Sequence, residues 1–198
     1  IKNGPIDFQP REPFSPLFGQ LYNTPMMMEF QITQEYLGFS NHLVYHGTTY
    51  EECLDSDTYR DGKGSTVAKM VKAIAGVANT GQDPNFCGYI FAQSNWYAFG
   101  RLAWNPTLSA EQIADEWARQ TFIKPKGMTS TAYEQKFLIP VKDMMMSSRE
   151  TAVNYMMPLG FHHIFGGSHY GPGPWENSIR RPDWSPIFYH KADKDGVG

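Results

Sequence analysis

The stretch Met26-Met27-Met28-Glu29-Phe30-Gln31-Ile32-Thr33 alternates apolar and polar side chains, and its period determines the fold class that we expect. Met28, Phe30 and Ile32 fall on one side of an extended chain, and the polar residues between them fall on the other. A period of two is typical of a β-strand with one buried face. The stretch therefore predicts a strand over residues 26–33 whose apolar face packs on a core.

Helical and strand patterns alternate after this strand. Apolar residues at helical spacing from Val67 to Val77 predict an amphipathic helix over residues 64–78, and the apolar run at residues 88–92 predicts a second strand. Alternation of this kind is typical of parallel βα units. The fold class that we predict is therefore α/β, built either as a doubly wound sheet or as a barrel.

A further helix is predicted to begin after Ser109. Gln112 lies three positions later, as in a capping box, and Ile113, Trp117 and Phe122 follow on one stripe. This stripe predicts a helix that packs against the core.

The pattern changes after residue 122. Lys124-Pro125-Lys126-Gly127 predicts a turn, and a second capping-box spacing, Ser147 with Glu150, predicts a helix that starts there and ends near Pro158. We therefore place a domain boundary near Ile123, with residues 1–122 in an α/β domain and residues 123–198 in a mainly helical one.

Composition excludes several classes of protein. A hydrophobic fraction of 41% argues against disorder, and a net charge of -3 gives no basic field for nucleic acid or an anionic membrane. No apolar run approaches the roughly 20 residues of a membrane span. Cys53 and Cys87 are too few for a disulfide framework, so we expect free thiols. The aromatic fraction of 15% fits either an aromatic core or a platform for sugar rings.

Two acidic residues follow predicted strand ends. Asp7 comes after Ile6 and an Asn-Gly-Pro turn, and Glu35 comes just after the strand at residues 26–33. Parallel barrels keep their reacting groups at such ends, and paired carboxylates suit hydrolysis of a glycosidic bond. Acids there also cap helices or form surface ion pairs. Lys2 fits either an anionic substrate group or an ion pair with a carboxylate.

Other motifs give little support to alternative chemistry. His162, His163 and His169 are close in sequence, but the Cys, His or carboxylate spacing of a zinc site is missing, so we expect no metal. No Gly-rich nucleotide loop and no Gly-x-Ser-x-Gly elbow occurs in the sequence.

Five longer stretches together resemble one enzyme family, the glycoside hydrolase family 67 α-glucuronidases. They are KNGPIDFQPREPF, EFQITQEYLG, NWYAFGRLAW, FHHIFGGSHYGPGPW and DWSPIFYHKAD, in that order. The resemblance implies the C-terminal portion of a TIM-type (β/α)8 barrel over residues 1–122, followed by the beginning of a mainly helical domain over residues 123–198. It also implies that the sequence is an internal part of a longer chain. At residues 46–48 the sequence departs from the apolar, Leu-Gly-Pro-like stretch of the family.

The resemblance also implies an activity. The family releases glucuronic acid, or its 4-O-methyl ether, from α-1,2 linkage to xylo-oligosaccharides with inversion, and it uses no cofactor. Asp7 and Glu35 match its pair of acids proposed to activate water, Lys2 matches a pocket lysine, and Trp184 falls where it can either reach the substrate or pack between the two domains. The general acid of the family lies on an earlier strand, so activity is expected only in the full-length protein.

Other functions are also consistent with the sequence, and the resemblance implies partners and a location. A carbohydrate-binding or degenerate barrel without turnover, or a barrel glycosidase of other sugar specificity, is also consistent with the sequence. By resemblance, the partners are glucuronoxylan-derived oligosaccharides and a second copy of the chain, which would form a homodimer through the helical domain. The resemblance implies a cytoplasmic or periplasmic location in bacteria and secretion in fungi.

Overall fold

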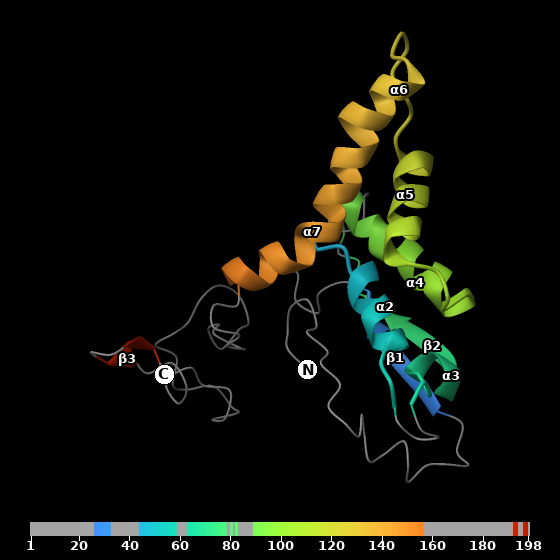
Figure 1. Cartoon of the computed structure of the whole chain (residues 1–198), viewed down its shortest axis with the longest axis vertical. Coiled ribbons are helices and arrows are strands. Elements are labelled where there is room, and N and C mark those ends of the chain that lie inside the picture. The colour runs from blue at the N-terminus through green and yellow to red at the C-terminus, as the bar shows by residue number, and fades with distance from the viewer. Residues whose placement is uncertain are drawn as a thin grey trace.

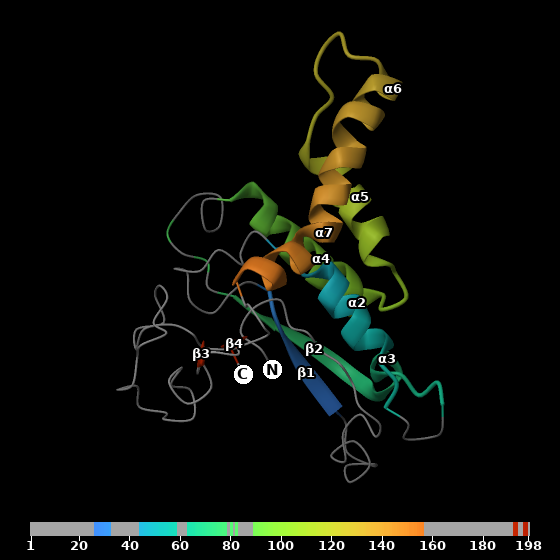
Figure 2. The same cartoon turned by 60° about the vertical axis from the view of Figure 1, so that its left-hand side comes forward.

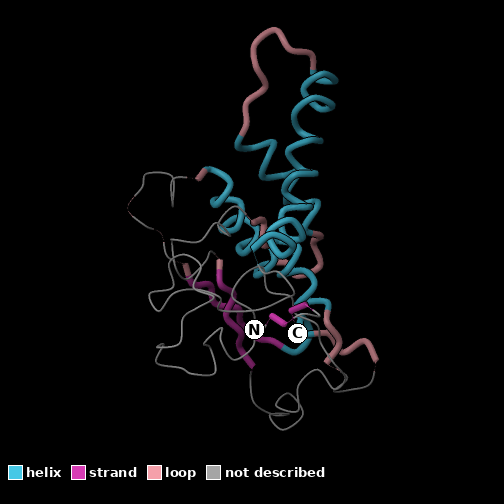
Figure 3. Tube along the Cα trace, turned by 90° about the vertical axis from the view of Figure 1, so that its left-hand side faces the viewer, coloured by secondary structure: helices cyan, strands magenta, loops and turns pink. Residues whose placement is uncertain are grey.

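The computed structural model combines a small parallel sheet with a group of helices (Figure 1). It describes residues 26–32, 44–58, 63–78, 80, 82, 89–156, 192–193 and 196–197 of the 198-residue sequence. The helical part extends well beyond the strands (Figure 3).

Strands β1 (Met26–Gln31) and β2 (Val71–Val77) pair in parallel, with Gln31 opposite Val77. Helices α2 (Gly47–Asp55) and α3 (Val67–Met70) lie between them in the sequence (Figure 2). Parallel strands need such a crossover because a tight turn reverses the chain direction. This β1–α2–α3–β2 arrangement confirms the α/β class. The barrel stays a prediction.

The strand predicted over residues 26–33 is confirmed over Met26–Gln31, and its faces are as expected. Phe30 and Ile32 are buried, whereas Met27 and Glu29 on the opposite face are exposed. The alternation is thus the signature of a strand with one face on the core.

The helix predicted over residues 64–78 is wrong. The helical part, α3, ends at Met70, and residues from Val71 onward form β2. Apolar spacing at Val71, Ile74 and Val77 fits a helix, but β-branched side chains also favour a strand, and pairing with β1 satisfies the backbone of β2. The local sequence fits a helix and a strand about equally well, and pairing with β1 determines that this segment is a strand.

The strand predicted over residues 88–92 is also wrong. Ile90–Ala92 form a 3-10 turn, η2, which leads directly into α4 (Gln93–Trp104). The Ser94 hydroxyl donates to the Phe91 carbonyl at 2.6 Å and stabilises this helical start. Short apolar runs do not distinguish a buried strand from the beginning of a helix.

Helix α5 (Ala110–Thr121) confirms the helix predicted after Ser109. The Gln112 amide N–H donates to the Ser109 hydroxyl at 3.1 Å, and the Ser109 N–H donates to the Gln112 side-chain oxygen at 3.1 Å. Ile113 and Trp117 are buried as predicted. The Glu51 carboxylate of α2 also accepts a hydrogen bond from the Ala110 N–H, which ties the start of α5 to α2.

The last part of the described chain is one long helical segment. It comprises α6 (Ser130–Tyr133), the π-turn η3 (Glu134–Leu138) and α7 (Ile139–Met156). The predicted turn before it is confirmed, with Gly127 at a φ of 87°. The capping box predicted at Ser147 is wrong, because Ser147 lies inside α7, where its hydroxyl donates to the Asp143 carbonyl.

Helices α5 and α7 pack side by side and form the hairpin at the top of Figure 1. Beyond them, β3 (Ala192–Asp193) and β4 (Gly196–Val197) form a short antiparallel pair.

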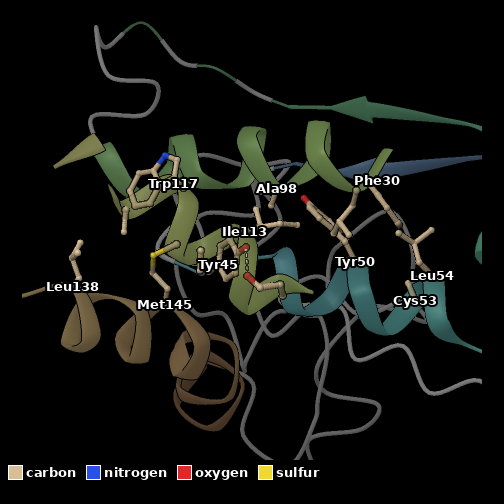
Figure 4. Close-up of a cluster of buried hydrophobic side chains, with 14 of the residues drawn as sticks. Phe30, Tyr45, Tyr50, Cys53, Leu54, Ala98, Ile113, Trp117, Leu138 and Met145 are labelled. Carbon is tan, nitrogen blue, oxygen red and sulfur yellow. Dashed lines mark hydrogen bonds between the residues drawn. The ribbon is translucent and has the colours of Figure 1, made fainter. Parts of the chain in front are cut away.

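A single group of buried side chains joins the sheet to the helices. It runs from Phe30 on β1 through Tyr45 and Tyr50 to Leu138 and Met145 at the helical hairpin (Figure 4). The core therefore includes side chains from both sides of Ile123, whose own side chain is exposed. The domain boundary near Ile123 stays a prediction.

Gly76 provides a test of how closely β2 packs. A Cβ atom at this position would lie 2.5 Å from Ile32 Cδ1 and 2.7 Å from Phe99 Cζ. We predict that Gly76→Ala destabilises the fold by about 1–3 kcal/mol in urea unfolding, because these side chains must move. The control is Gly100→Ala on α4, where a Cβ meets nothing within 4 Å and should stabilise by about 0.5–1 kcal/mol. Equal effects of the two changes would contradict the prediction.

Candidate functional site

The residues predicted from the sequence to act on substrate lie outside the described part of the structure. These are Asp7, Glu35, Lys2 and Trp184, and the His162-His163 pair, His169 and Cys87 lie outside it too. Their roles stay predictions. The structure does describe both ends of the connection that carries Glu35: the end of β1 before it and the start of α2 after it.

The carboxyl end of β1 is held by β2 and α2. The Ile32 N–H donates to the Val77 carbonyl at 2.7 Å, and the Tyr50 hydroxyl donates to the Gln31 carbonyl at 2.8 Å. The Tyr50 ring also stacks on Phe30, with centroids 4.6 Å apart. Because Tyr50 belongs to the first turns of α2, the start of this helix lies at the carboxyl end of the strand.

A buried asparagine of α4 fixes the residues that lead into α2. Asn95 is fully buried, and its side-chain oxygen accepts from the His46 N–H at 2.8 Å. Its side-chain NH2 donates to the Val44 carbonyl at 2.9 Å. One amide group therefore satisfies two backbone groups of residues 44–46.

Helices α5 and α7 bind Tyr45, which lies between Val44 and His46. The Tyr45 N–H donates to the Ser148 hydroxyl of α7 at 2.8 Å, and the Tyr45 hydroxyl donates to the Ala110 carbonyl at 2.9 Å (Figure 4). Burial raises the pKa of Tyr45 well above its usual range, and the nearby Glu51 raises it further. Tyr45 is thus a neutral anchor.

His46 is the buried titratable group of this region. It is 5% exposed, and its ring lies against Tyr50 with centroids 6.0 Å apart. Burial, followed by the positive charge of Arg149, lowers the pKa of His46 to about 4. Arg149 itself pairs with Glu52. The imidazole is therefore neutral at neutral pH, and it makes no hydrogen bond to another described side chain or backbone group.

Cys53 is a free, buried thiol, as predicted. Burial, followed by the charge of Glu52, raises the pKa of this thiol to about 12. The thiol is protonated at neutral pH and is a poor nucleophile. It serves as a small apolar side chain of the core.

Many of the described aromatic side chains pack against one another in the core of the helical hairpin. The rings of Phe91, Trp117 and Phe122 lie within 5.4–5.7 Å of one another, and Phe122 also meets Phe137 at 5.2 Å. This supports an aromatic core for the described region.

The described residues provide neither a metal site nor a membrane-spanning helix. Among them, no group of three or more His, Cys, Asp or Glu side chains is placed to hold a metal ion. None of the helices in this part of the chain combines the length and apolar character needed to cross a membrane.

None of the contacts at residues 44–46 was predicted from the sequence. Asn95 and Ser148 carry no motif, and their partners lie 49 to 103 positions away in the chain. The sequence carried no signal for these long-range contacts.

Comparison with known proteins gives matches over the whole chain. A model described as glycosyl hydrolase family 67 middle domain matches residues 1–86, and one described as glycosyl hydrolase family 67 C-terminus matches residues 87–198. "Alpha-glucuronidase A" of Emericella nidulans is 38% identical over 100% of this chain and 23% of its own length. "Probable alpha-glucuronidase A" of Aspergillus oryzae is 39% identical over 100% of this chain and 24% of its own. The chain thus spans about a quarter of the length of these relatives.

The buried His46 predicts a pH dependence of stability. The folded state binds its proton only below about pH 4, whereas the unfolded state binds it below about pH 6.5. The contribution of His46 is therefore fully present above pH 6.5 and is lost as the pH falls towards 4, by about 3 kcal/mol in total. His46→Phe keeps a ring against Tyr50 and removes the titration. We expect urea unfolding at pH 7 and pH 4.5 to show a smaller loss in this variant, and an equal loss would contradict the assignment.

Proposed function

The chain belongs to glycosyl hydrolase family 67, and from this membership we propose that it supplies part of the active site of an α-glucuronidase. The observation that carries the proposal is the alignment of the whole chain with proteins named alpha-glucuronidase A. In this proposal, residues 1–122 form the end of a TIM-type barrel and residues 123–198 begin a helical domain. The parallel β1–α2–α3–β2 unit supports the barrel part.

The proposed reaction is hydrolysis of the α-1,2 bond between a glucuronic acid, or its 4-O-methyl ether, and a xylo-oligosaccharide. Hydrolysis with inversion needs one carboxylate to take a proton from water and a carboxylic acid to protonate the leaving oxygen. The two groups must stand roughly 6.5–9.5 Å apart to leave room for that water. We assign the activation of water to Asp7 and Glu35. The general acid belongs to another strand of the complete barrel.

Position alone does not divide the work between Asp7 and Glu35. One takes the proton, and the other orients the water or adjusts the pKa of its neighbour. Support for Glu35 comes from the end of β1, where Gln31 and Ile32, four and three residues before it, are bound by Tyr50 and Val77. A side chain that must meet a water within a fraction of an ångström benefits from such a fixed origin.

Substrate recognition is assigned to Lys2 and Trp184. A uronic acid differs from a neutral sugar by its carboxylate, so a cationic ammonium group in the pocket favours the uronide. An indole ring offers a flat apolar surface for a sugar ring. The reaction needs no metal and no organic cofactor, because carboxyl groups perform both proton transfers. We also propose that the complete protein forms a homodimer through its helical region and that it binds no nucleic acid.

The first test concerns the two acids, in a chain of the relatives' full length that contains this sequence. Asp7→Ala and Glu35→Ala should each lower kcat for release of glucuronic acid from an α-1,2-glucuronosyl xylo-oligosaccharide by about a hundredfold or more. The matched control is Asp55→Ala, an exposed carboxylate at the last residue of α2, which should leave kcat unchanged. NMR of the first-formed sugar should show the β-anomer. Binding without hydrolysis by the unmodified chain would contradict the proposed activity.

The second test concerns the pocket lysine. Lys2→Met should remove most of the preference for a uronide over the matching neutral glucoside, because the ammonium–carboxylate contact is lost. The measurement is the ratio of kcat/KM for the two substrates. Lys72→Met, at an exposed position of β2, is the control and should keep the ratio of the unmodified chain. An unchanged ratio in Lys2→Met would exclude Lys2 from the pocket.

A further inference from the structure

We propose that Asn95 and Ser148 are positioning residues for catalysis, because they hold residues 44–46, where the connection that carries Glu35 joins α2. The inference rests on the proposed function. It gives the helices of the second half of the chain a part in the chemistry.

Asn95 makes bonds that few other side chains can replace. Its amide sits inside α4, is fully buried, and both donates to Val44 and accepts from His46. A buried amide is costly unless its hydrogen bonds are made, and an apolar residue in its place would leave the buried Val44 carbonyl and His46 N–H without this partner. The bonding of both polar ends to the backbone of residues 44–46 indicates that the position of this segment is what Asn95 determines.

Ser148 binds the same segment from a different helix, α7. Its hydroxyl donates to the Met145 carbonyl at 2.6 Å and accepts from the Tyr45 N–H at 2.8 Å. Among the described residues, the neighbouring Ser147 hydroxyl bonds only to carbonyls of its own helix. The Arg149–Glu52 ion pair also joins α7 to α2.

The other end of the connection is held to the same frame. Gln31 and Ile32 are bound by Tyr50 of α2 and by Val77 of β2. The backbone positions before and after residues 33–43 are thus fixed relative to each other. Fixed ends reduce the conformations open to a connecting segment, and a displacement of about 1 Å at a catalytic group can cost about a hundredfold in rate.

The hydrogen bonds of Asn95 and Ser148 to residues 44–46 connect regions that match different family models. Residues 44–46 lie in the match to the middle domain, and Asn95 and Ser148 lie in the match to the C-terminus. The positioning bonds therefore cross from one region into the other. A substitution in the region that matches the C-terminus should therefore change the catalytic rate, even though the substituted residue does not contact substrate.

The experiment compares two adjacent serines in a chain of the relatives' full length. Ser148→Ala should lower kcat for the glucuronosyl xylo-oligosaccharide by about tenfold to a hundredfold, with KM changed by less than about twofold. Ser147→Ala should leave both constants unchanged, and Ser148→Thr, which keeps the hydroxyl, should restore most of kcat. Asn95→Ala should act in the same direction, with Asn105→Ala, at the half-buried C-cap of α4, as its control.

Measurements of folding separate positioning from stability. Amide hydrogen exchange at Tyr45 should be faster in Ser148→Ala, whose thermal midpoint falls below that of Ser147→Ala because the buried Tyr45 N–H loses its partner, but stays above the assay temperature. A kcat equal to that of Ser147→Ala, or a loss that merely follows the unfolded fraction, would overturn the inference and leave the proposed function standing if Glu35→Ala is inactive. Absence of hydrolysis by the unmodified chain would overturn the proposed function and this inference with it.

Discussion

The parallel pairing of β1 with β2 is the constraint on which the rest of the described structure depends. Two parallel strands cannot be joined by a tight turn, so the chain must return along the sheet before β2 begins. Helices α2 and α3 make that return. As a result, the start of α2 lies at the carboxyl end of β1, where Tyr50 binds the Gln31 carbonyl. In parallel α/β folds this edge holds the reacting groups, so the pairing brings the Glu35 connection to the place where catalysis is proposed.

The polar groups at the start of α2 show how such an edge is kept ordered inside the protein. Buried amide, hydroxyl and guanidinium groups cost stability unless they are bonded. Here Asn95 and Ser148 bind backbone groups, and Arg149 pairs with Glu52. His46 avoids the cost of a buried charge by staying neutral, since burial and Arg149 both lower its pKa. Electrostatics and hydrogen bonding thus favour one arrangement of residues 44–46.

The sequence predicted the elements whose signals are local. The alternation at residues 26–33 gave β1, and the Ser109–Gln112 spacing gave the start of α5, because each depends on neighbours in the chain. Residues 71–77 were predicted as helix since their strand state depends on pairing with β1, about 45 positions away. Ser147 had a capping spacing, but α7 continued through it. The bonds of Asn95 and Ser148 had no sequence signal, because they join residues distant in the chain. The resemblance, not periodicity, supplied the assignments of Asp7, Glu35, Lys2 and Trp184, and these stay predictions.

An inverting mechanism makes unusual demands on such long-range bonds. The water must fit between a base and an acid that come from different strands, so an error in the position of either carboxyl group changes the gap that holds the water. The position of a catalytic group between two elements depends on the points where its segment meets the scaffold. In this chain one of those points is bound by β2 and α2, and the other by α4, α5 and α7. Helices α4, α5 and α7 therefore complete the scaffold of the proposed site, which accounts for a residue as costly to bury as Asn95 in α4.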